Sequence, residues 1–148
     1  MKIITFLFTA FISLQMFGQE KFPDGTPIPD WFRQNEIVDI ETLGKKYILT
    51  DYGVANDSTA VQTEKIQAVI DRAAKDGGGV IVIPRGTFLS GSIFFKPKTH
   101  LYMEEGAVLK GSDDISNFAI VDTRIEGQSL KYFAALVNAD KVNGFTIS

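Results

Sequence analysis

Residues 77–95 read GGGVIVIPRGTFLSGSIFF, and this stretch decides the fold class of the chain. It holds three runs of apolar or β-branched residues, and glycine, proline or serine separates each run from the next. Short runs of this kind, closely spaced and punctuated by glycine, are typical of strands in an all-β fold. We therefore predict strands at 80–83, 87–89 and 92–95.

Similar phrases recur downstream, where a glycine again precedes a short apolar run, at 106–109 and 144–147. Further strands are expected at 47–50, 100–103 and 134–137. No Asn-Gly or Asp-Gly pair joins these runs at the spacing of a two-residue hairpin, which gives an antiparallel meander little support. Uneven repetition of a turn and a short apolar run is instead typical of the coils of a parallel β-solenoid.

One amphipathic helix is predicted just upstream of these strands, from about Thr63 to Lys75. Its apolar residues recur at the spacing of a single helical face, and polar residues fill the rest of its circumference. The members of this face are Ile66, Val69, Ile70, Ala73 and Ala74. Gly77-Gly78-Gly79 ends the helix, because glycine adopts the left-handed capping conformation without strain. The first coil of a solenoid would otherwise expose its core, so we expect this helix to cap it.

The first 18 residues are predicted to be a signal peptide. After Met1-Lys2, residues 3–17 are almost entirely apolar, and Gly18 is a small residue suited to cleavage. The apolar run is shorter than the roughly 20 residues that cross a bilayer, which disfavours the alternative of a retained membrane anchor. The mature protein is therefore expected to begin at Gln19, to be exported to the periplasm or beyond, and to have no stable membrane insertion.

Residues 19–46 are expected to form an irregular extension, because three prolines and a glycine stand at its start. Trp31 and Phe32 follow the prolines. Two readings of this aromatic pair are open: it packs against the main body, or it offers a stacking face to a ligand. Packing is the favoured reading, since large aromatic side chains mostly serve burial.

The composition excludes several classes of function. Lys and Arg number 15 against 18 Asp and Glu, giving a formal net charge of −3, so the chain lacks the basic field that nucleic acids require. There is no cysteine and only one histidine. Disulfides, thiolate catalysis and zinc–thiolate sites are therefore excluded, and we predict no metal and no cofactor.

An ordered series of motifs runs through residues 52–109. Its first part holds Tyr52-Gly53, Asn56-Asp57, residues 66–71, Gly77-Gly78-Gly79, Val82-Ile83-Pro84 and Gly86-Thr87-Phe88. This part resembles the N-terminal end of the pectate-lyase superfold, the right-handed parallel β-helix. The continuation through 89–95 and 101–109 resembles glycoside hydrolase family 28, the polygalacturonases and rhamnogalacturonan hydrolases. The resemblance extends from about Phe22 to Ser148, and residues 123–127 also resemble a segment of bacterial exo-acting members.

The resemblance implies inverting hydrolysis of α-linked galacturonosyl bonds in pectin. The family's catalytic motifs (Asn-Thr-Asp, Asp-Asp, Gly-His-Gly and Arg-Ile-Lys) lie further along the solenoid, and none occurs here. The chain is therefore expected to be the truncated N-terminal part, residues 47–148, of a longer β-helix domain, with no catalytic residue of its own. Asp113-Asp114 and His100 lack the flanking residues of those motifs, and we predict structural roles for them.

Arg124 and Glu126 are the candidate substrate-binding residues. A guanidinium group binds a carboxylate through two parallel hydrogen bonds, which suits the uronic acid of a pectic polysaccharide or oligogalacturonide. The alternative is that the two residues pair with surface neighbours and hold a loop. Two other functions also stay open: a calcium-dependent polysaccharide lyase on the same solenoid, and a non-catalytic carbohydrate-binding solenoid with exposed aromatics such as Trp31 or Tyr132.

Overall fold

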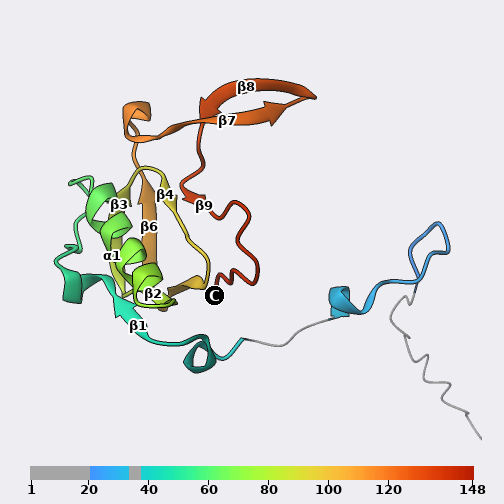
Figure 1. The fold of residues 1–148 in the computed structure, drawn as a ribbon, viewed down its shortest axis with the longest axis horizontal. Coiled ribbons are helices and arrows are strands. Elements are labelled where there is room, and N and C mark those ends of the chain that lie inside the picture. Colours follow the sequence, from blue (N-terminus) through green and yellow to red (C-terminus); the bar gives the residue numbers. More distant parts are fainter. Residues whose placement is uncertain (1–20, 34–37) are drawn as a thin grey trace, which may run out of the picture. The chain divides into compact units, whose positions relative to one another are not determined.

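The computed structural model describes residues 21–33 and 38–148. They fall into two compact units, one before residue 37 and one from there to Ser148 (Figure 1). The predicted signal peptide, residues 1–18, lies outside the described residues. Within the described ranges, no helix has the length and apolar character needed to cross a membrane.

The N-terminal unit contains a small aromatic cluster. Lys21 and Pro27 form an isolated antiparallel bridge, and a short 3-10 helix covers Asp30–Arg33. The ring of Trp31 stacks on that of Phe32 with centroids 3.9 Å apart, and Phe22 meets Phe32 edge-on at 5.5 Å. The aromatic pair thus packs within its own segment, and its packing against the main body stays a prediction.

The second unit is built mainly of short strands that form three parallel ladders and one hairpin. The first ladder contains β1 (Lys46–Ile48), β2 (Gly79–Ile83) and β5 (Thr99–Met103) in that order. The second contains β3 (Gly86–Ser90) and β6 (Ala107–Gly111), and the third contains β4 (Ile93–Phe94) and β9 (Val137–Asn138). The predicted strands at 80–83, 87–89, 100–103 and 106–109 are confirmed in position, and β4 covers only the middle two residues of the predicted 92–95.

Each ladder contributes one column of side chains to the core. In each ladder, apolar residues that pair in register belong to the core cluster or pack against it. The columns are Tyr47–Ile81–Leu101 in the first ladder, Phe88–Leu109 in the second and Ile93–Val137 in the third. This stacking of apolar residues explains the repeated short apolar runs, because each run supplies one layer to the column of its own ladder.

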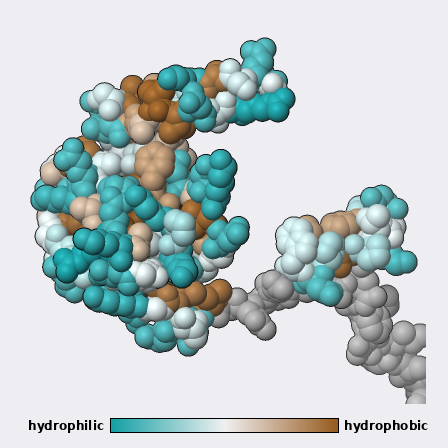
Figure 2. Space-filling view, viewed as in Figure 1, coloured by the Kyte–Doolittle hydropathy of each residue, from teal (hydrophilic) through white to brown (hydrophobic). Residues whose placement is uncertain are grey.

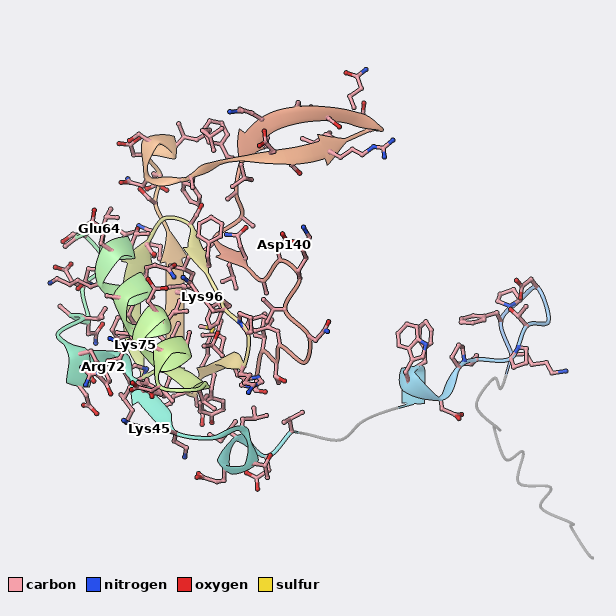
Figure 3. The ribbon with its side chains drawn as sticks, in the orientation of Figure 1. Lys45, Glu64, Arg72, Lys75, Lys96 and Asp140 are labelled. Atoms are coloured by element: carbon pink, nitrogen blue, oxygen red, sulfur yellow. The ribbon has the colours of Figure 1, made fainter. Side chains whose placement is uncertain are left out.

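Helix α1 (Thr63–Lys75) has the bounds that the sequence predicts. Ile66, Val69, Ile70 and Ala73 are buried in the core cluster with the first strands. Charged residues of its outer face, among them Glu64, Arg72 and Lys75, extend away from the strands (Figure 3). The helix therefore closes one end of the strand columns with a single apolar face.

Polar side chains complete the hydrogen bonding where a strand has no neighbouring strand. The Gln67 side chain of α1 accepts from the Phe94 amide at 2.8 Å and donates to the Phe94 carbonyl at 2.9 Å. Gln67 also donates to Asp71, which forms an ion pair with Lys96 at 3.0 Å. One glutamine thus takes the place of a paired strand at the edge of β4 nearest the helix.

Gln67→Leu is expected to lower the free energy of unfolding by about 1–3 kcal/mol, because both peptide groups at Phe94 lose their partner in a half-buried place. Lys65→Leu, on the exposed face of the same helix, is the matched control and should change stability little. Urea titrations of the two variants measure the difference. Equal stability of both variants would contradict the role assigned to Gln67.

Residues 120–133 correct one expectation from the sequence. They form an antiparallel hairpin of β7 (Ile120–Ile125) and β8 (Gln128–Phe133), although the absence of Asn-Gly and Asp-Gly pairs at two-residue hairpin spacing gives antiparallel pairing little support. Glu126 and Gly127 make the turn with φ of 50° and 85°, the left-handed values that such a turn requires. A Glu-Gly pair therefore does here what Asn-Gly does more commonly.

Three further predicted strands are shorter in the structure or reduced to a single bridge. β9 begins only at Val137 within the predicted 134–137, and in 144–147 a single bridge joins Ile147 to Leu101. At the first ladder, residues 47–50 are strand only up to Ile48, and a 3-10 helix, Leu49–Tyr52, follows. Other short 3-10 helices cover Ile40–Leu43 and Ile115–Asn117.

The hairpin is an insertion between two ladders. Partner residues are 20 apart from β2 to β5 and 21 apart from β3 to β6, as Ile81–Leu101 and Phe88–Leu109 show. From β4 to β9 the separation is 44, as in Ile93–Val137. The extra residues form the 3-10 helix Ile115–Asn117 and the hairpin, which projects from the body (Figure 1).

Candidate functional site

Both predicted substrate-binding residues lie on the projecting hairpin. Arg124 is in β7, directly opposite Ser129 of β8, and Glu126 occupies the turn. Both side chains are exposed. The Arg124 Nε donates a hydrogen bond to the Gly127 carbonyl at 3.0 Å, so the guanidinium is held against the turn of its own hairpin.

The structure does not join Arg124 and Glu126 to each other. Within the described residues, ion pairs at 4.0 Å or less involve neither side chain. The contact that fixes Arg124 uses Nε and leaves the two terminal nitrogens of the guanidinium as donors. Arg124 therefore stabilises the turn of its own hairpin, and its role in ligand binding stays a prediction.

Lys131 is the residue that sequence reasoning missed. It lies directly opposite Asp122 in the register, two positions from Ser129, so it shares one face of the hairpin with Arg124. Asp122, Arg124, Ser129 and Lys131 line a shallow cavity of about 640 Å³. We call these four residues the cationic face. Its two cations outnumber its one carboxylate, which suits an anionic ligand.

A second cavity lies where the hairpin joins the body. It has a volume of about 390 Å³, and we call it the base cavity. Its lining includes Ser112, Asp113, Phe118, Tyr132, Phe133 and Ala134. The rings of Tyr132 and Phe133 meet edge-on with centroids 5.5 Å apart. Figure 2 shows hydrophobic surface gathered at this end of the hairpin, while the far end is hydrophilic.

The two adjacent aspartates have different roles. The Asp114 carboxylate accepts a hydrogen bond from the Ser116 amide at 2.9 Å and caps the short helix that follows, which confirms its structural role. The same hydrogen bond lowers the pKa of Asp114 below its ordinary value. Asp113 is exposed and lines the base cavity instead.

His100 lies in β5 and is half-buried. Its Nδ1 atom is buried and has no hydrogen-bond partner among the described residues. Burial lowers the pKa of this histidine below its ordinary value. The neutral form is thus favoured in the folded protein, in agreement with a structural role.

This shift predicts a pH dependence of stability. Between the ordinary histidine pKa of about 6.5 and the lower folded value, the unfolded chain binds the proton and the folded chain does not. The free energy of unfolding is therefore expected to fall as the pH drops from about 7 towards 5, and this part of the loss should vanish in His100→Gln. Chemical denaturation at a series of pH values measures it. An unchanged slope in the variant would contradict the assignment.

Groups of three or more His, Cys, Asp or Glu placed to hold a metal ion do not occur within 21–33 and 38–148. The described side chains of the hairpin and base cavity supply hydrogen-bond donors, one cationic face and an aromatic wall. These groups can donate hydrogen bonds, attract an anion and contact an apolar surface.

Comparison with known proteins relates most of the chain to a described family. Residues 48–147 match the family model described as rhamnogalacturonase A/epimerase, pectate lyase-like. An exo-poly-α-D-galacturonosidase from Dickeya chrysanthemi is 34% identical over 98 residues, which is 66% of this chain and 15% of the relative.

Two solved structures are similar in fold. A hyperthermoactive exopolygalacturonase from Thermotoga maritima superimposes with a TM-score of 0.64 and 29% identity, covering 70% of this chain and 23% of that one. A family 28 exopolygalacturonase from Yersinia enterocolitica superimposes with a TM-score of 0.60 and 25% identity, covering 70% of this chain and 19% of that one. The chain thus spans between about a seventh and a quarter of the length of these proteins.

Proposed function

The chain belongs to the rhamnogalacturonase A/epimerase, pectate lyase-like family, and we propose that it is the N-terminal part of an exported glycoside hydrolase acting on pectin. In this proposal the whole protein cleaves α-linked galacturonosyl bonds. The observation that carries it is the similarity to an exo-poly-α-D-galacturonosidase over two thirds of the chain. Export would follow from a signal peptide at residues 1–18.

The three ladders support a finer account of the fold. Strands related by 20 or 21 residues stack in parallel in two ladders, strands 44 residues apart stack in the third, and α1 covers one end of their columns. We propose that these are the first coils of a right-handed parallel β-helix that continues in the rest of the protein. Each further coil would pair with the free edges of β6, β9 and the segment at Ile147.

The catalytic groups belong, in this proposal, to those further coils. Inverting hydrolysis needs one carboxylic acid to protonate the leaving oxygen and one carboxylate to activate water on the opposite face of the ring. These two groups stand roughly 6.5–9.5 Å apart so that the water fits between them. Neighbouring coils of a parallel solenoid can hold aspartates at such separations without a metal.

The contribution of the present chain is binding. On the cationic face, the terminal nitrogens of Arg124 would donate to the carboxylate of a galacturonosyl unit, as guanidinium forks do. Glu126, at the exposed turn beside it, would accept from sugar hydroxyls. The hairpin is thus proposed as a substrate-binding arm beside the coils.

Activity on polygalacturonate tests the proposal. The full-length protein is expected to release reducing sugars without forming unsaturated products, whereas the 148-residue chain alone is expected to be inactive. Unsaturated products from the full-length protein would replace the hydrolase with a lyase, and binding without any cleavage would leave a carbohydrate-binding solenoid. Hydrolysis by the 148-residue chain itself would refute the placement of the catalytic groups.

Arg124→Ala is expected to weaken binding of oligogalacturonides by about tenfold, because a charge-assisted hydrogen bond to the carboxylate is lost. Lys75→Ala, which removes an exposed cation of α1, is the control for net charge and should leave affinity unchanged. Isothermal titration with a uronate oligosaccharide and with a neutral one of equal length separates the effects. An equal loss for both ligands would assign Arg124 a purely structural role.

A further inference from the structure

We propose that Asn143 is a site of spontaneous modification, at which the asparagine converts to aspartate and isoaspartate through a cyclic imide. The site lies in the loop 139–146, which follows β9 and forms only isolated turns (Figure 1). The reaction consumes water alone and needs no enzyme, so it proceeds whatever ligand the hairpin binds.

The reaction joins Asn143 to the residue that follows it. The Gly144 backbone nitrogen attacks the side-chain carbonyl carbon of Asn143, and the new C–N bond closes the imide ring. The bond from this carbon to the side-chain nitrogen breaks, and that nitrogen leaves as ammonia with the proton that the backbone nitrogen gives up. Water then opens the ring, at the side-chain carbonyl to give aspartate or at the main-chain carbonyl to give isoaspartate.

The position of Gly144 favours this attack. A glycine has no side chain to shield its nitrogen and leaves the backbone free to rotate. Gly144 has a φ of 74°, and nothing lies within 4 Å of its Cβ position. Its amide donates no hydrogen bond to any described residue, so none has to break before the nitrogen reacts. Asn143 and Gly144 are both exposed.

Side-chain hydrogen bonds hold the other asparagines that the structure describes. These are Asn56, Asn117 and Asn138, which bond respectively to the Thr87 amide, the Ser112 hydroxyl and the backbone of Ile93 and Ala135. None of the three precedes a glycine. Within the described ranges, Asn143 therefore differs from every other asparagine both in its neighbour and in its freedom to react.

Two Asp-Gly pairs close to regular structure serve as internal controls. An aspartate forms the same imide with loss of water, but here the glycine amides are engaged. The Gly25 amide donates to the Phe22 carbonyl at 2.8 Å, and the Gly77 amide donates to the Ala74 carbonyl at 3.2 Å. These pairs are expected to stay unchanged while Asn143 reacts.

Isoaspartate at 143 is expected to weaken the pairing of the residues that follow. It routes the main chain through the side-chain carbons, which adds a carbon atom to the backbone just before residue 145. The Leu101 amide donates to the Thr146 carbonyl at 3.0 Å. The ring of Phe145 lies beside that of Phe95, with centroids 4.8 Å apart. Both contacts depend on the present length of the loop.

Peptide mapping by mass spectrometry, before and after incubation of the folded chain at mildly alkaline pH, tests the site. Trypsin cleaves after Lys141 and so separates Asn143 from Asn138. The peptide with Asn143 should gain about 1 Da, because a hydroxyl group replaces an amide NH₂. This gain should be at least about tenfold faster than that of the peptides with the other described asparagines.

Gly144→Ala tests the role of the glycine, and the exposed turn leaves room for the added methyl group. The variant should lose the fast gain in mass, and Asn143→Gln, which keeps the glycine, should lose it as well. Equal rates at all described asparagines, or an undiminished rate in Gly144→Ala, would overturn the assignment of the site.

Asn143→Asp separates the new charge from the longer main chain, because it carries the charge of the product on an ordinary backbone. In the incubated chain, the Leu101 amide is expected to exchange its hydrogen faster than in freshly prepared Asn143→Asp, whereas the Ile70 amide of α1 should exchange equally in both. Equal exchange at Leu101 in the two samples would contradict the effect of isoaspartate on pairing.

Discussion

Ile70→Asp is expected to lower the free energy of unfolding of the second unit by about 4–5 kcal/mol, a large fraction of the roughly 5–15 kcal/mol by which a single domain is stable. Ile70 has no exposed surface and lies in the core cluster beneath α1. An aspartate there either buries an unpaired charge or remains protonated at a high cost, and it also loses the apolar contacts of isoleucine.

Two controls accompany this variant. Ala68→Asp places the same charge on the exposed face of α1 and should change stability by less than about 1 kcal/mol. Ile70→Val removes a single methylene group and should cost about 0.5–1.5 kcal/mol. Thermal melts followed by circular dichroism measure all three. A melting temperature of Ile70→Asp equal to that of Ala68→Asp would show that the helix does not cover the core.

Gly79→Ala is expected to lower the free energy of unfolding by about 3 kcal/mol or more. At Gly79 φ is 147°, and a Cβ atom would lie 2.4 Å from the Lys45 carbonyl oxygen and 2.8 Å from the Tyr47 ring. The clash is with the Lys45 carbonyl just before β1 and with the Tyr47 ring of β1, and the Lys45 carbonyl cannot move without losing the hydrogen bond that it accepts from the Val80 amide. The destabilisation of Gly79→Ala is therefore the sum of two contributions, backbone strain at a positive φ and overpacking against the neighbouring atoms.

Gly127→Ala separates these two causes. Gly127 also has a positive φ, 85°, but nothing lies within 4 Å of its Cβ position. Gly127→Ala should therefore lower the free energy of unfolding only by the conformational cost of the positive φ, about 1 kcal/mol. Denaturant titrations compare the two variants. If Gly79→Ala were no more damaging than Gly127→Ala, the close approach of β1 to β2 would be incorrect.

The strands and the helix of the body were predictable because local pattern and tertiary burial agree there. In α1 the apolar face read from the sequence is the face that the structure buries, as Ile66 and Ile70 show. In β2, β3 and β5 each apolar run supplies one layer of a column, so a run of three to five residues marks a strand. Parallel pairing followed from the uneven repetition of those runs.

The hairpin was not predictable from the same pattern. Its strands are mostly exposed, with Ile120, Ile125 and Tyr132 on the surface, so no core selects their apolar residues. Its turn uses Glu126 at φ 50°, a conformation in which glutamate is uncommon. A search for Asn-Gly or Asp-Gly therefore passes over it.

The candidate site also contains residues that the sequence identifies and residues that only the structure identifies. Arg124 was identified through a resemblance and not through local pattern, and its hydrogen bond to the Gly127 carbonyl is a feature of the turn that only coordinates reveal. Lys131 and Tyr132 became candidates because the antiparallel register places one on each face of the hairpin. Without the register, a lysine seven residues beyond an arginine has no relation to it.

The configuration of the first sugar released tests the central claim most directly. The full-length protein, incubated with trigalacturonate and followed by proton NMR, is expected to release a product whose new reducing end is initially the β-anomer, because water attacks the face opposite the α-linked leaving group. The α-anomer as first product would contradict the inverting mechanism. A product with a C4–C5 double bond would contradict hydrolysis altogether.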